Sequence, residues 1–315
     1  MMKILREIDD LALLSKPLHF AIGVFDGLHL GHQAVIRRAV DAAAESDGLA
    51  VLISFDPHPR AVLAVGEPPL VLTNGDHKIR LAQKLGIDAT LLIQFNEDFA
   101  SRSGREFIES LVQVSPDLRL ISVGAGWKFG SDRSGDFQLL EQLGAEFGFE
   151  AFGAKTVRIG DQRVSSTAIR EAISIGDFLS CSEMLGREYS VFGEVIRGAQ
   201  RGRQIGFHTA NLAVANEQLP PGGVYVVRAD LNGESFGGVA NLGVRPTLDD
   251  PNAQRLLEVH LFDYSGPEFY GENLEVWFVK FLREERKFES IDHLKAQIEL
   301  DASSARDALL AEHRD

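Results

Sequence analysis

The chain has 315 residues, of which 44% are hydrophobic and 25% charged, and its formal net charge is −14. This length predicts two domains rather than one, and no apolar run approaches the roughly 20 residues of a membrane-spanning helix. The acidic balance argues against a nucleic-acid polymer and gives no sign of a membrane partner, whereas a small phosphorylated ligand can still bind at glycine-rich turns.

The N-terminal segment and the cysteine content bear on cellular location. The first ten residues soon turn acidic and lack the apolar core and cleavage site of a secretory signal. The single cysteine, Cys181, cannot form an internal disulfide, which is compatible with a reducing compartment. Both features predict a cytoplasmic protein, and neither specifies an oligomeric state.

In the first part of the chain, apolar runs alternate with helix-like segments. The runs lie near residues 18–25, 49–55, 88–95, 118–123 and 149–157. The helix-like segments lie near residues 30–45, 76–86, 104–114 and 136–147. This alternation predicts a Rossmann-like α/β domain with a mostly parallel sheet, over residues 1–186, whose ligands bind outside the carboxyl ends of the strands.

After two short helical segments that end near Gly186, the pattern changes to short strands separated by turns. The expected strands are Ser190–Ile196, Val224–Leu231, Phe236–Asn241, Leu257–Phe262 and Leu274–Phe281. A helix is expected from about Ile291 to His313. The second domain, residues 187–315, is therefore predicted to be a small antiparallel β-barrel with a C-terminal helix.

The segment GVFDGLHLGH, residues 23–32, follows the first expected strand. Gly23 and Gly27 permit a tight turn, and the helix that follows points its free N–H groups and its positive end at that turn. His29 and His32 are three residues apart, so both imidazoles lie on one face of the first helical turn. There they can donate hydrogen bonds to phosphate oxygens as charge develops during a displacement.

Two alternatives to a phosphate site stay open for the histidine pair on spacing alone. The pair can be ordinary half-buried filler near a helix start. A zinc site is the weaker alternative, because the chain has one cysteine and no His-Glu-x-x-His arrangement, although His58 in Phe55-Asp-Pro-His-Pro59 offers a third nitrogen.

A third segment clusters hydroxyl groups at an expected helix start. Ser165, Ser166 and Thr167 offer hydroxyls and amides, and Arg170 can form two parallel hydrogen bonds to phosphate. Taken alone, the segment is explained as well by a helix cap and a surface arginine. Three phosphate-compatible segments, each beside an expected strand end, favour a functional site.

These three segments carry a family resemblance. GVFDGLHLGH resembles the signature of the nucleotidylyltransferase superfamily and, more narrowly, of the prokaryotic bifunctional riboflavin kinase/FAD synthetase family. Phe55-Asp-Pro-His-Pro59 and Val164-Ser-Ser-Thr-Ala-Ile-Arg170 are similar to two further motifs of that family. The resemblance implies catalytic roles for His29, His32 and Arg170. It implies ATP or phosphate contacts from Gly23, Phe25, Asp26, Gly27, His58, Ser165, Ser166 and Thr167.

The loop Gly124–Gly130 departs from the family pattern, which has an acidic residue before an aromatic one. Gly126 and Trp127 stand at these positions. An indole still offers a flat face for a flavin or adenine ring, so Trp127 and Phe129 are the expected flavin-binding residues. The polar contact that a carboxylate would make is missing.

The segment Arg201–Leu212 carries a second set of phosphate-compatible residues. Gly202, Arg203 and Gly206 suit a phosphate-binding turn, and Thr209 and Asn211 offer oxygen ligands of the kind that Mg²⁺ prefers. By itself the pattern fits a solvated hairpin equally well.

Stretches farther along the chain resemble the riboflavin kinase module. They are Gly223-Val-Tyr-Val-Val, the segment 238–247 and Leu257-Glu-Val-His-Leu-Phe-Asp263. The resemblance implies Mg²⁺ binding by Thr209 and Asn211 and makes Glu258 the general base. A carboxylate on an apolar strand can be partly desolvated for that task, although a solvent-facing residue of an alternating strand has the same pattern. His208 stands where the family has proline.

The resemblance implies two reactions. The C-terminal domain is expected to phosphorylate riboflavin with ATP to give FMN, with Mg²⁺ as cofactor. The N-terminal domain is expected to adenylylate FMN with a second ATP, which gives FAD and pyrophosphate. Two alternatives stay open: another nucleotidylyltransferase with an unrelated barrel, and a flavin-binding or regulatory protein without turnover, motivated by Gly126 and His208.

Overall fold

The computed structural model describes residues 2–63, 68–197, 209–214, 217–244 and 255–312. The chain divides into two compact units. The first contains Met1–Ala168 and Met184–Gly186, and the second contains Ile169–Glu183 and Arg187–Asp315. The expected domain boundary after residue 186 stays a prediction, because a short segment before it groups with the second unit.

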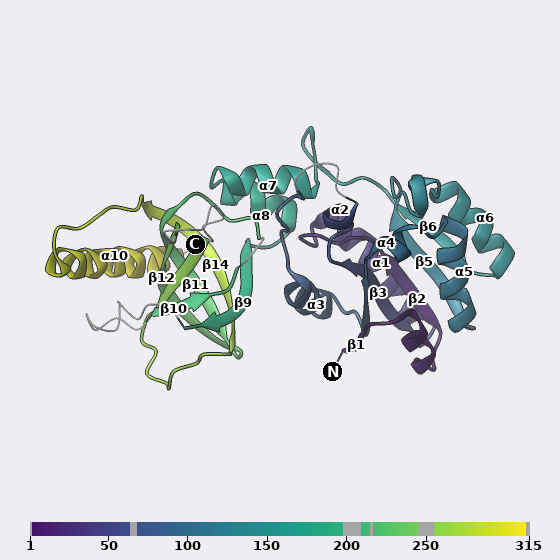
Figure 1. Cartoon of the computed structure of the whole chain (residues 1–315), viewed down its shortest axis with the longest axis horizontal. Coiled ribbons are helices and arrows are strands. Elements are labelled where there is room, and N and C mark those ends of the chain that lie inside the picture. Colours follow the sequence, from purple (N-terminus) through teal and green to yellow (C-terminus); the bar gives the residue numbers. More distant parts are fainter. Residues whose placement is uncertain (1, 64–67, 198–208, 215–216, 245–254, 313–315) are drawn as a thin grey trace. The chain divides into compact units, whose positions relative to one another are not determined.

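The first unit is built on a six-stranded sheet with the strand order β1-β4-β3-β2-β5-β6 (Figure 1). Neighbouring strands are parallel throughout. The strands are β1 Lys3–Leu5, β2 Leu18–Ile22, β3 Leu49–Asp56, β4 Ala89–Gln94, β5 Leu118–Gly124 and β6 Glu150–Ala154. The central strands are continuous apolar runs because helices cover both faces of the sheet.

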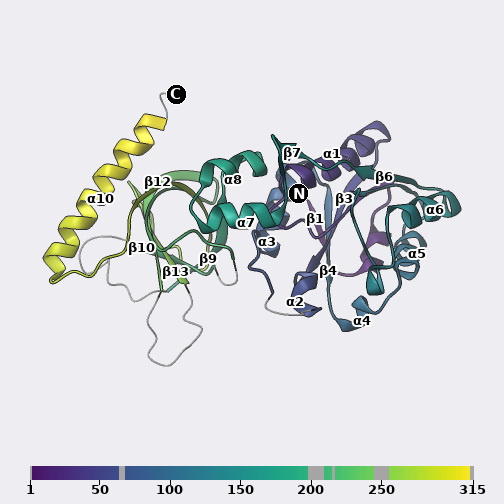
Figure 2. The ribbon, with the colours of Figure 1, turned by 90° about the horizontal axis from the view of Figure 1, so that it is seen from above.

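Helices cover both faces of the sheet (Figure 2), and each face has its own apolar cluster. One face packs on α1 Leu30–Glu45 and α3 Gly75–Lys84, and the other packs on η1 Ile8–Leu13, α5 Gly104–Val114 and α6 Phe137–Phe147. Shorter elements join them: α2 Pro59–Val62, α4 Glu97–Ala100, η2 Ser131–Arg133, and the hairpin β7 Arg158–Ile159 with β8 Gln162–Arg163.

The position of β2 in the sheet determines where a ligand can bind. β2 pairs with β3 on one side and with β5 on the other. The strands β3 and β4, which follow β2 in sequence, therefore lie on one side of it, whereas β5 and β6 lie on the other side. At such a reversal the loops that follow the two strands separate and leave a crevice outside their carboxyl ends. The loop after Ile22 and the loop after Gly124 both begin at this edge.

The second unit contains a closed antiparallel barrel with the strand order β10-β13-β12-β11-β14-β9. Its strands are β9 Ser190–Ile196, β10 Thr209–Leu212, β11 Gly223–Leu231, β12 Glu234–Val244, β13 Arg255–Leu261 and β14 Asn273–Arg283. Helices α7 Ser166–Ser174 and α8 Phe178–Leu185 precede the barrel in sequence, and α10 Ile291–Glu312 follows it.

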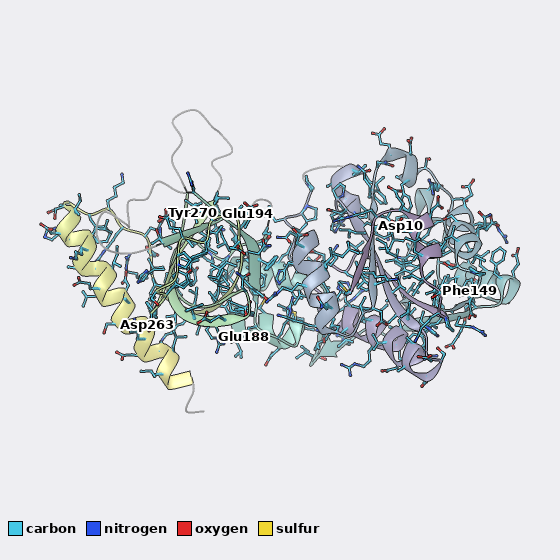
Figure 3. The ribbon with its side chains drawn as sticks, turned by 90° about the horizontal axis from the view of Figure 1, so that it is seen from below. Asp10, Phe149, Glu188, Glu194, Asp263 and Tyr270 are labelled. Atoms are coloured by element: carbon cyan, nitrogen blue, oxygen red, sulfur yellow. The ribbon has the colours of Figure 1, made fainter. Side chains whose placement is uncertain are left out.

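Helix α10 packs against the outside of the barrel. Ala305 is fully buried against Val226 and Phe262. Gly237 lets the helix come close, because a Cβ there would lie 2.6 Å from Leu309 Cδ1. Figure 3 shows Asp263 beside this helix, where its carboxylate accepts a hydrogen bond of 2.8 Å from Arg306.

The predicted fold class is confirmed: a parallel α/β unit is followed by an antiparallel barrel and a C-terminal helix. The prediction missed β1, which has three residues and no apolar run, and β10, where Thr209 and Asn211 were interpreted as oxygen ligands and not as part of a strand. Among the described residues, the model contains no helix with the length and apolarity needed to cross a membrane.

Candidate functional site

The turn after β2 has an unusual backbone. Three of its residues have positive φ angles: Phe25 at 49°, Gly27 at 86° and Leu28 at 41°. Only glycine adopts this region without steric cost, so the two other residues are held there by their surroundings. A Cβ at Gly27 would also lie 2.7 Å from Leu72 Cδ1. The expected tight turn is present, and Gly27 is essential to it.

Asp26 holds this turn in place through hydrogen bonds of its carboxylate. Its side chain is buried, with 3% exposure, and Oδ1 accepts hydrogen bonds from the backbone N–H groups of Leu72 at 2.7 Å and Thr73 at 3.2 Å. The hydroxyl of Thr73 in turn accepts a hydrogen bond from the N–H of Gly27 at 3.1 Å. The carboxylate thus fixes the shape of the turn, and its expected phosphate contact stays a prediction.

Ser166 connects the third motif to the first. Its Oγ donates a hydrogen bond of 2.9 Å to the backbone carbonyl of Asp26, 140 residues away in sequence. Ser165 caps the same helix start, since its Oγ accepts from the N–H of Ala168 at 3.3 Å. Thr167 is exposed in the first turn of α7. Two motifs that the sequence only suggested as partners therefore lie together.

Arg170 lies one turn further along α7, in the part of the helix that groups with the second unit. Its expected contact with phosphate stays a prediction.

The two histidines form a stacked pair at the start of α1. Their ring centroids are 3.6 Å apart with an angle of 16° between the planes, and the edge of the Phe25 ring lies against His32. His29 is the N-cap residue, because its Nδ1 accepts a hydrogen bond of 3.3 Å from the backbone N–H of His32. A Cβ at Gly31 would come within 3.1 Å of His29 Cε1, so a larger residue there would push on the His29 ring. The expected common face of the imidazoles is present.

His32 is uncharged at physiological pH. Burial lowers its pKa well below the usual value of 6.5, and the proximity of His29 and Lys78 lowers it further. Its Nδ1 is buried and has no hydrogen-bond partner among the described residues. A neutral imidazole with an unsatisfied buried nitrogen is suited to hydrogen bonding with a ligand.

Lys78 on α3 is a charged residue of this site that the sequence analysis missed. Its side chain is buried, and its Nζ donates a hydrogen bond of 3.0 Å to Ser54 Oγ on β3. A helical-spacing signal was present, because Leu81 and Ala82 lie three and four residues after it and are both buried. An apolar stripe that begins with a lysine marks that lysine as partly or fully buried.

His58 lies after the end of β3, beside the loop that follows β2. Its Nδ1 caps the short helix α2 by accepting a hydrogen bond of 3.1 Å from the N–H of Arg60. Within the described ranges, no three His, Cys, Asp or Glu residues lie together in an arrangement that could hold a metal ion. The histidine pair and His58 thus do not form a three-ligand metal cluster in this part of the chain, and the phosphate contact of His58 stays a prediction.

The loop after β5 presents two stacked aromatic rings. The centroids of Trp127 and Phe129 are 4.2 Å apart with planes at 11°. Phe129 is buried, with 6% exposure, and packs in the apolar core, whereas Trp127 is half-buried. A Cβ at Gly126 would meet no atom within 4 Å, so the missing carboxylate does not reflect a lack of space. Flavin binding by these rings stays a prediction.

In the second unit, three polar residues form a row across neighbouring strands. Asn211 on β10 pairs in register with Glu258 on β13, and Glu258 pairs with Asn241 on β12. Residues directly opposite each other in antiparallel strands point to the same face of the sheet. Asn211 is buried, and its Oδ1 has no hydrogen-bond partner among the described residues.

Two cavities lie beside this row. One, of about 280 Å³, is lined by residues that include Asn241, Glu258, Phe288 and, from α10, Leu294 and Ile298. The other, of about 400 Å³, is lined by residues that include Tyr264, Phe269 and Tyr270. Thr209 and His260 line both cavities. Gly202, Arg203, Gly206 and His208 lie outside the described residues.

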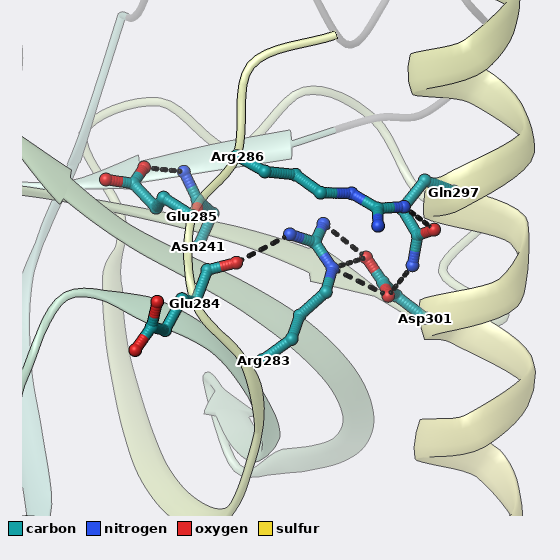
Figure 4. Close-up of polar contacts among 7 residues, drawn as sticks. All are labelled: Asn241, Arg283, Glu284, Glu285, Arg286, Gln297 and Asp301. Carbon is teal, nitrogen blue, oxygen red and sulfur yellow. Dashed lines mark hydrogen bonds and ion pairs between the residues drawn. The ribbon is translucent and has the colours of Figure 1, made fainter.

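An ion pair fixes α10 as a wall of the smaller cavity (Figure 4). Arg283 on β14 donates two hydrogen bonds to the carboxylate of Asp301, from Nε at 3.0 Å and from Nη2 at 2.7 Å. Gln297 also donates to Asp301, at 2.6 Å. Arg283 and Asp301 both line the cavity, so the pair determines its shape.

Comparison with known proteins gives one consistent result. Residues 14–168 match the FAD synthetase family model, and residues 185–309 match the riboflavin kinase family model. The bifunctional riboflavin kinase/FMN adenylyltransferase of Haemophilus influenzae is 38% identical over 306 residues, which cover 97% of this chain and 98% of that protein. The chain belongs to the bifunctional riboflavin kinase/FMN adenylyltransferase family. It is a bifunctional enzyme that carries both activities.

Two further relatives support this assignment of the family and its fold. The Pseudomonas fluorescens family member is 37% identical and covers 90% of this chain and 91% of its own length. A crystal structure described as a macrolide-efflux protein from Streptococcus pneumoniae has a TM-score of 0.78 and 28% identity, over 97% of this chain and 98% of that one. Because the riboflavin kinase model matches the barrel, the alternative with an unrelated barrel is wrong.

The hydrogen bond from Ser166 can be tested in the full-length enzyme. Ser166→Ala removes the donor to the Asp26 carbonyl, and we expect kcat/KM for FMN adenylylation to fall about 5-fold, since one such bond is worth about 1 kcal/mol. Riboflavin phosphorylation should not change. Ser174→Ala is the matched control, because Ser174 is exposed near the end of the same helix and donates only to Glu171 O. Equal rates in both variants would contradict the prediction.

The ion pair of Figure 4 can be tested in the same way. Asp301→Ala leaves Arg283 without its carboxylate, and we expect the KM for riboflavin to rise about 10-fold and the free energy of unfolding to fall by about 2 kcal/mol. Steady-state kinetics and denaturant unfolding measure the two effects. Glu299→Ala, at an exposed position on α10, is the control. An unchanged KM would contradict the prediction.

Proposed function

We propose that riboflavin and ATP occupy the two barrel cavities and react where the cavities meet. The observation that carries the proposal is that Thr209 and His260 line both cavities, while Glu258 lines only the smaller one. Aromatic and aliphatic side chains line the smaller cavity and suit a flavin ring system. The proposed base, Glu258, lines the same cavity. The larger one has Tyr264 and Phe269, whose rings suit an adenine.

Two residues of strand β10, Thr209 and Asn211, fit a magnesium site. The unsatisfied, buried Oδ1 of Asn211 and the hydroxyl of Thr209 are neutral oxygen donors, and Mg²⁺ binds readily to a few such ligands together with nucleotide phosphates. When bound there, the ion would neutralise phosphate charge. The proposed phosphate contacts of Gly202, Arg203 and Gly206 belong to the segment just before Thr209 in sequence.

In the proposed kinase reaction, Glu258 is the general base. Its carboxylate takes the proton of the ribityl 5′-hydroxyl as that oxygen attacks the γ-phosphorus of ATP. The bond to the bridging oxygen breaks, and FMN and ADP result. The amide side chains of Asn211 and Asn241 flank Glu258 in the strand register. They limit where the carboxylate and the substrate hydroxyl can meet.

In the proposed adenylyl transfer, an FMN phosphate oxygen attacks the α-phosphorus of ATP and pyrophosphate leaves. His29 and His32 donate hydrogen bonds to the oxygens on which charge develops, and the positive end of helix α1 adds to this stabilisation. We assign the hydroxyls of Ser165 and Thr167, together with Arg170, to the triphosphate. Trp127 stacks on the flavin, and Phe129 supports the indole from the core.

The proposal includes riboflavin, FMN and ATP as the small-molecule partners and the cytoplasm as the location. The location is supported by the lone cysteine, Cys181, because a chain without an internal disulfide is compatible with a reducing compartment. We place the boundary between the two catalytic domains after residue 186.

The assignment of one activity to each domain can be tested with two variants of the full-length enzyme. Glu258→Gln should lower FMN formation from riboflavin about 1000-fold, because general-base catalysis is lost, and leave the conversion of supplied FMN to FAD intact. His29→Asn should lower FAD formation about 100-fold and leave FMN formation intact. Asparagine retains the helix N-cap, so the second variant removes the imidazole without removing the cap.

Both activities are measured by chromatographic separation of riboflavin, FMN and FAD after incubation with ATP and Mg²⁺. If both variants lose the same activity, the assignment of the two sites is wrong. If the wild-type chain makes neither FMN nor FAD, the alternative of a flavin-binding protein without turnover holds instead.

A further inference from the structure

Lys78 is a buried cation behind the glycine turn of the adenylyl-transfer site. Its side chain is 5% exposed, and its ammonium donates a hydrogen bond of 3.0 Å to Ser54 Oγ. The hydroxyl of Ser54, itself buried, donates a hydrogen bond of 2.9 Å to the carbonyl of Val24, the second residue of the turn. Three elements are thereby connected: helix α3, strand β3 and the turn after β2.

Charged and titratable groups surround this ammonium from each neighbouring element. Asp26 faces it from the turn and Asp56 from the end of β3, and both attract its charge. From α1, His32 lies near enough for the ammonium to disfavour its protonation. The Asp26 carboxylate is already hydrogen-bonded to two backbone amides. The ammonium therefore adds its charge to a network that the backbone already fixes.

The chemistry of the site requires a positive charge that His32 does not supply. His32 is neutral, so the stacked pair offers hydrogen bonds and no net charge from that ring. Adenylyl transfer brings together a phosphate dianion and a triphosphate, and a cation in a poorly hydrated site stabilises such charge far more than one in water. Lysine is costly to bury, and a methionine would fill the space beside this turn equally well, so packing alone does not account for the charge.

We propose that Lys78 is a positioning residue of the adenylyl-transfer site, whose ammonium holds the glycine turn through Ser54 and provides the positive charge behind the imidazole pair. The inference rests on the proposed use of that pair in FMN adenylylation. It adds a residue from α3, outside the three motifs, and it predicts how the rate of FMN adenylylation depends on pH.

The sign of the pH effect follows from the environment of Lys78. Burial lowers its pKa from 10.5 to about 8, against the opposing attraction of Asp26 and Asp56. The ammonium is present below pH 8 and is lost as the pH rises through that value. FMN adenylylation by the wild-type enzyme should therefore decline about tenfold per pH unit above about 8.

The test measures kcat for FMN adenylylation between about pH 6 and pH 10 in three forms of the full-length enzyme. They are the wild type, Lys78→Met and Lys78→Arg. Methionine fills the space without charge, and arginine keeps a charge that does not titrate in this range. Lys84→Met, at an exposed position on the same helix, is the control. Riboflavin phosphorylation, measured on each sample, is the internal check that the chain is active.

We expect kcat of Lys78→Met to fall about 100-fold below pH 8 and to show no decline near that pH. Lys78→Arg should restore most of the rate and should lack the decline as well. Wild-type rate and pH profile in Lys78→Met would overturn the inference while FMN adenylylation itself stands. If Lys78→Met does not fold, the test depends on Lys78→Arg. A decline of kcat near pH 8 in Lys78→Arg overturns the inference, and loss of that decline supports it.

The proposed function fails in a different way. If His29→Asn keeps the wild-type rate of FAD formation, the imidazole pair is not the site of adenylyl transfer, whatever the Lys78 variants show.

Discussion

The site of the first unit depends on the backbone and side chain of one residue, Asp26. Its carboxylate holds the segment around Leu72 and Thr73, and its carbonyl accepts the hydroxyl of Ser166. Three segments that lie far apart in sequence therefore meet at one position. Because the residue is buried, these hydrogen bonds have little competition from water and act as a fixed scaffold. The orientation of the two imidazoles follows from this scaffold, since the turn leads directly into their helix.

This arrangement has a cost in folding free energy. Phe25 and Leu28 adopt left-handed backbone conformations, and an ammonium and an uncharged imidazole are buried within the same few residues. Each of these features costs on the order of 1–3 kcal/mol unless the surroundings compensate it. The continuous apolar strands and the two helical layers supply the compensating stability. A rigid parallel sheet can hold a strained turn at its edge, whereas an isolated loop would relax.

Much of this structure was predictable from hydrophobic periodicity. The central strands of the sheet and the helices between them were expected within a few residues of their observed bounds, because their apolar patterns are long and regular. Strand β10 was missed, since four residues are too few to show alternation. Asp26 was expected to contact phosphate, and the sequence does not show that backbone amides 46 residues away would occupy its carboxylate. Lys78 was missed although Leu81 and Ala82 give a helical-spacing signal for its burial, because that signal does not show which polar groups its ammonium meets.

Position 126 has a consequence for how this enzyme can vary. The glycine there has an ordinary backbone angle, and the space next to its Cα is open. A Cβ can therefore be added there without meeting the stacked rings of Trp127 and Phe129. Every glycine codon is one base change from a codon for an acidic residue. A carboxylate at this position is thus one base change away, and the fold leaves room for its Cβ.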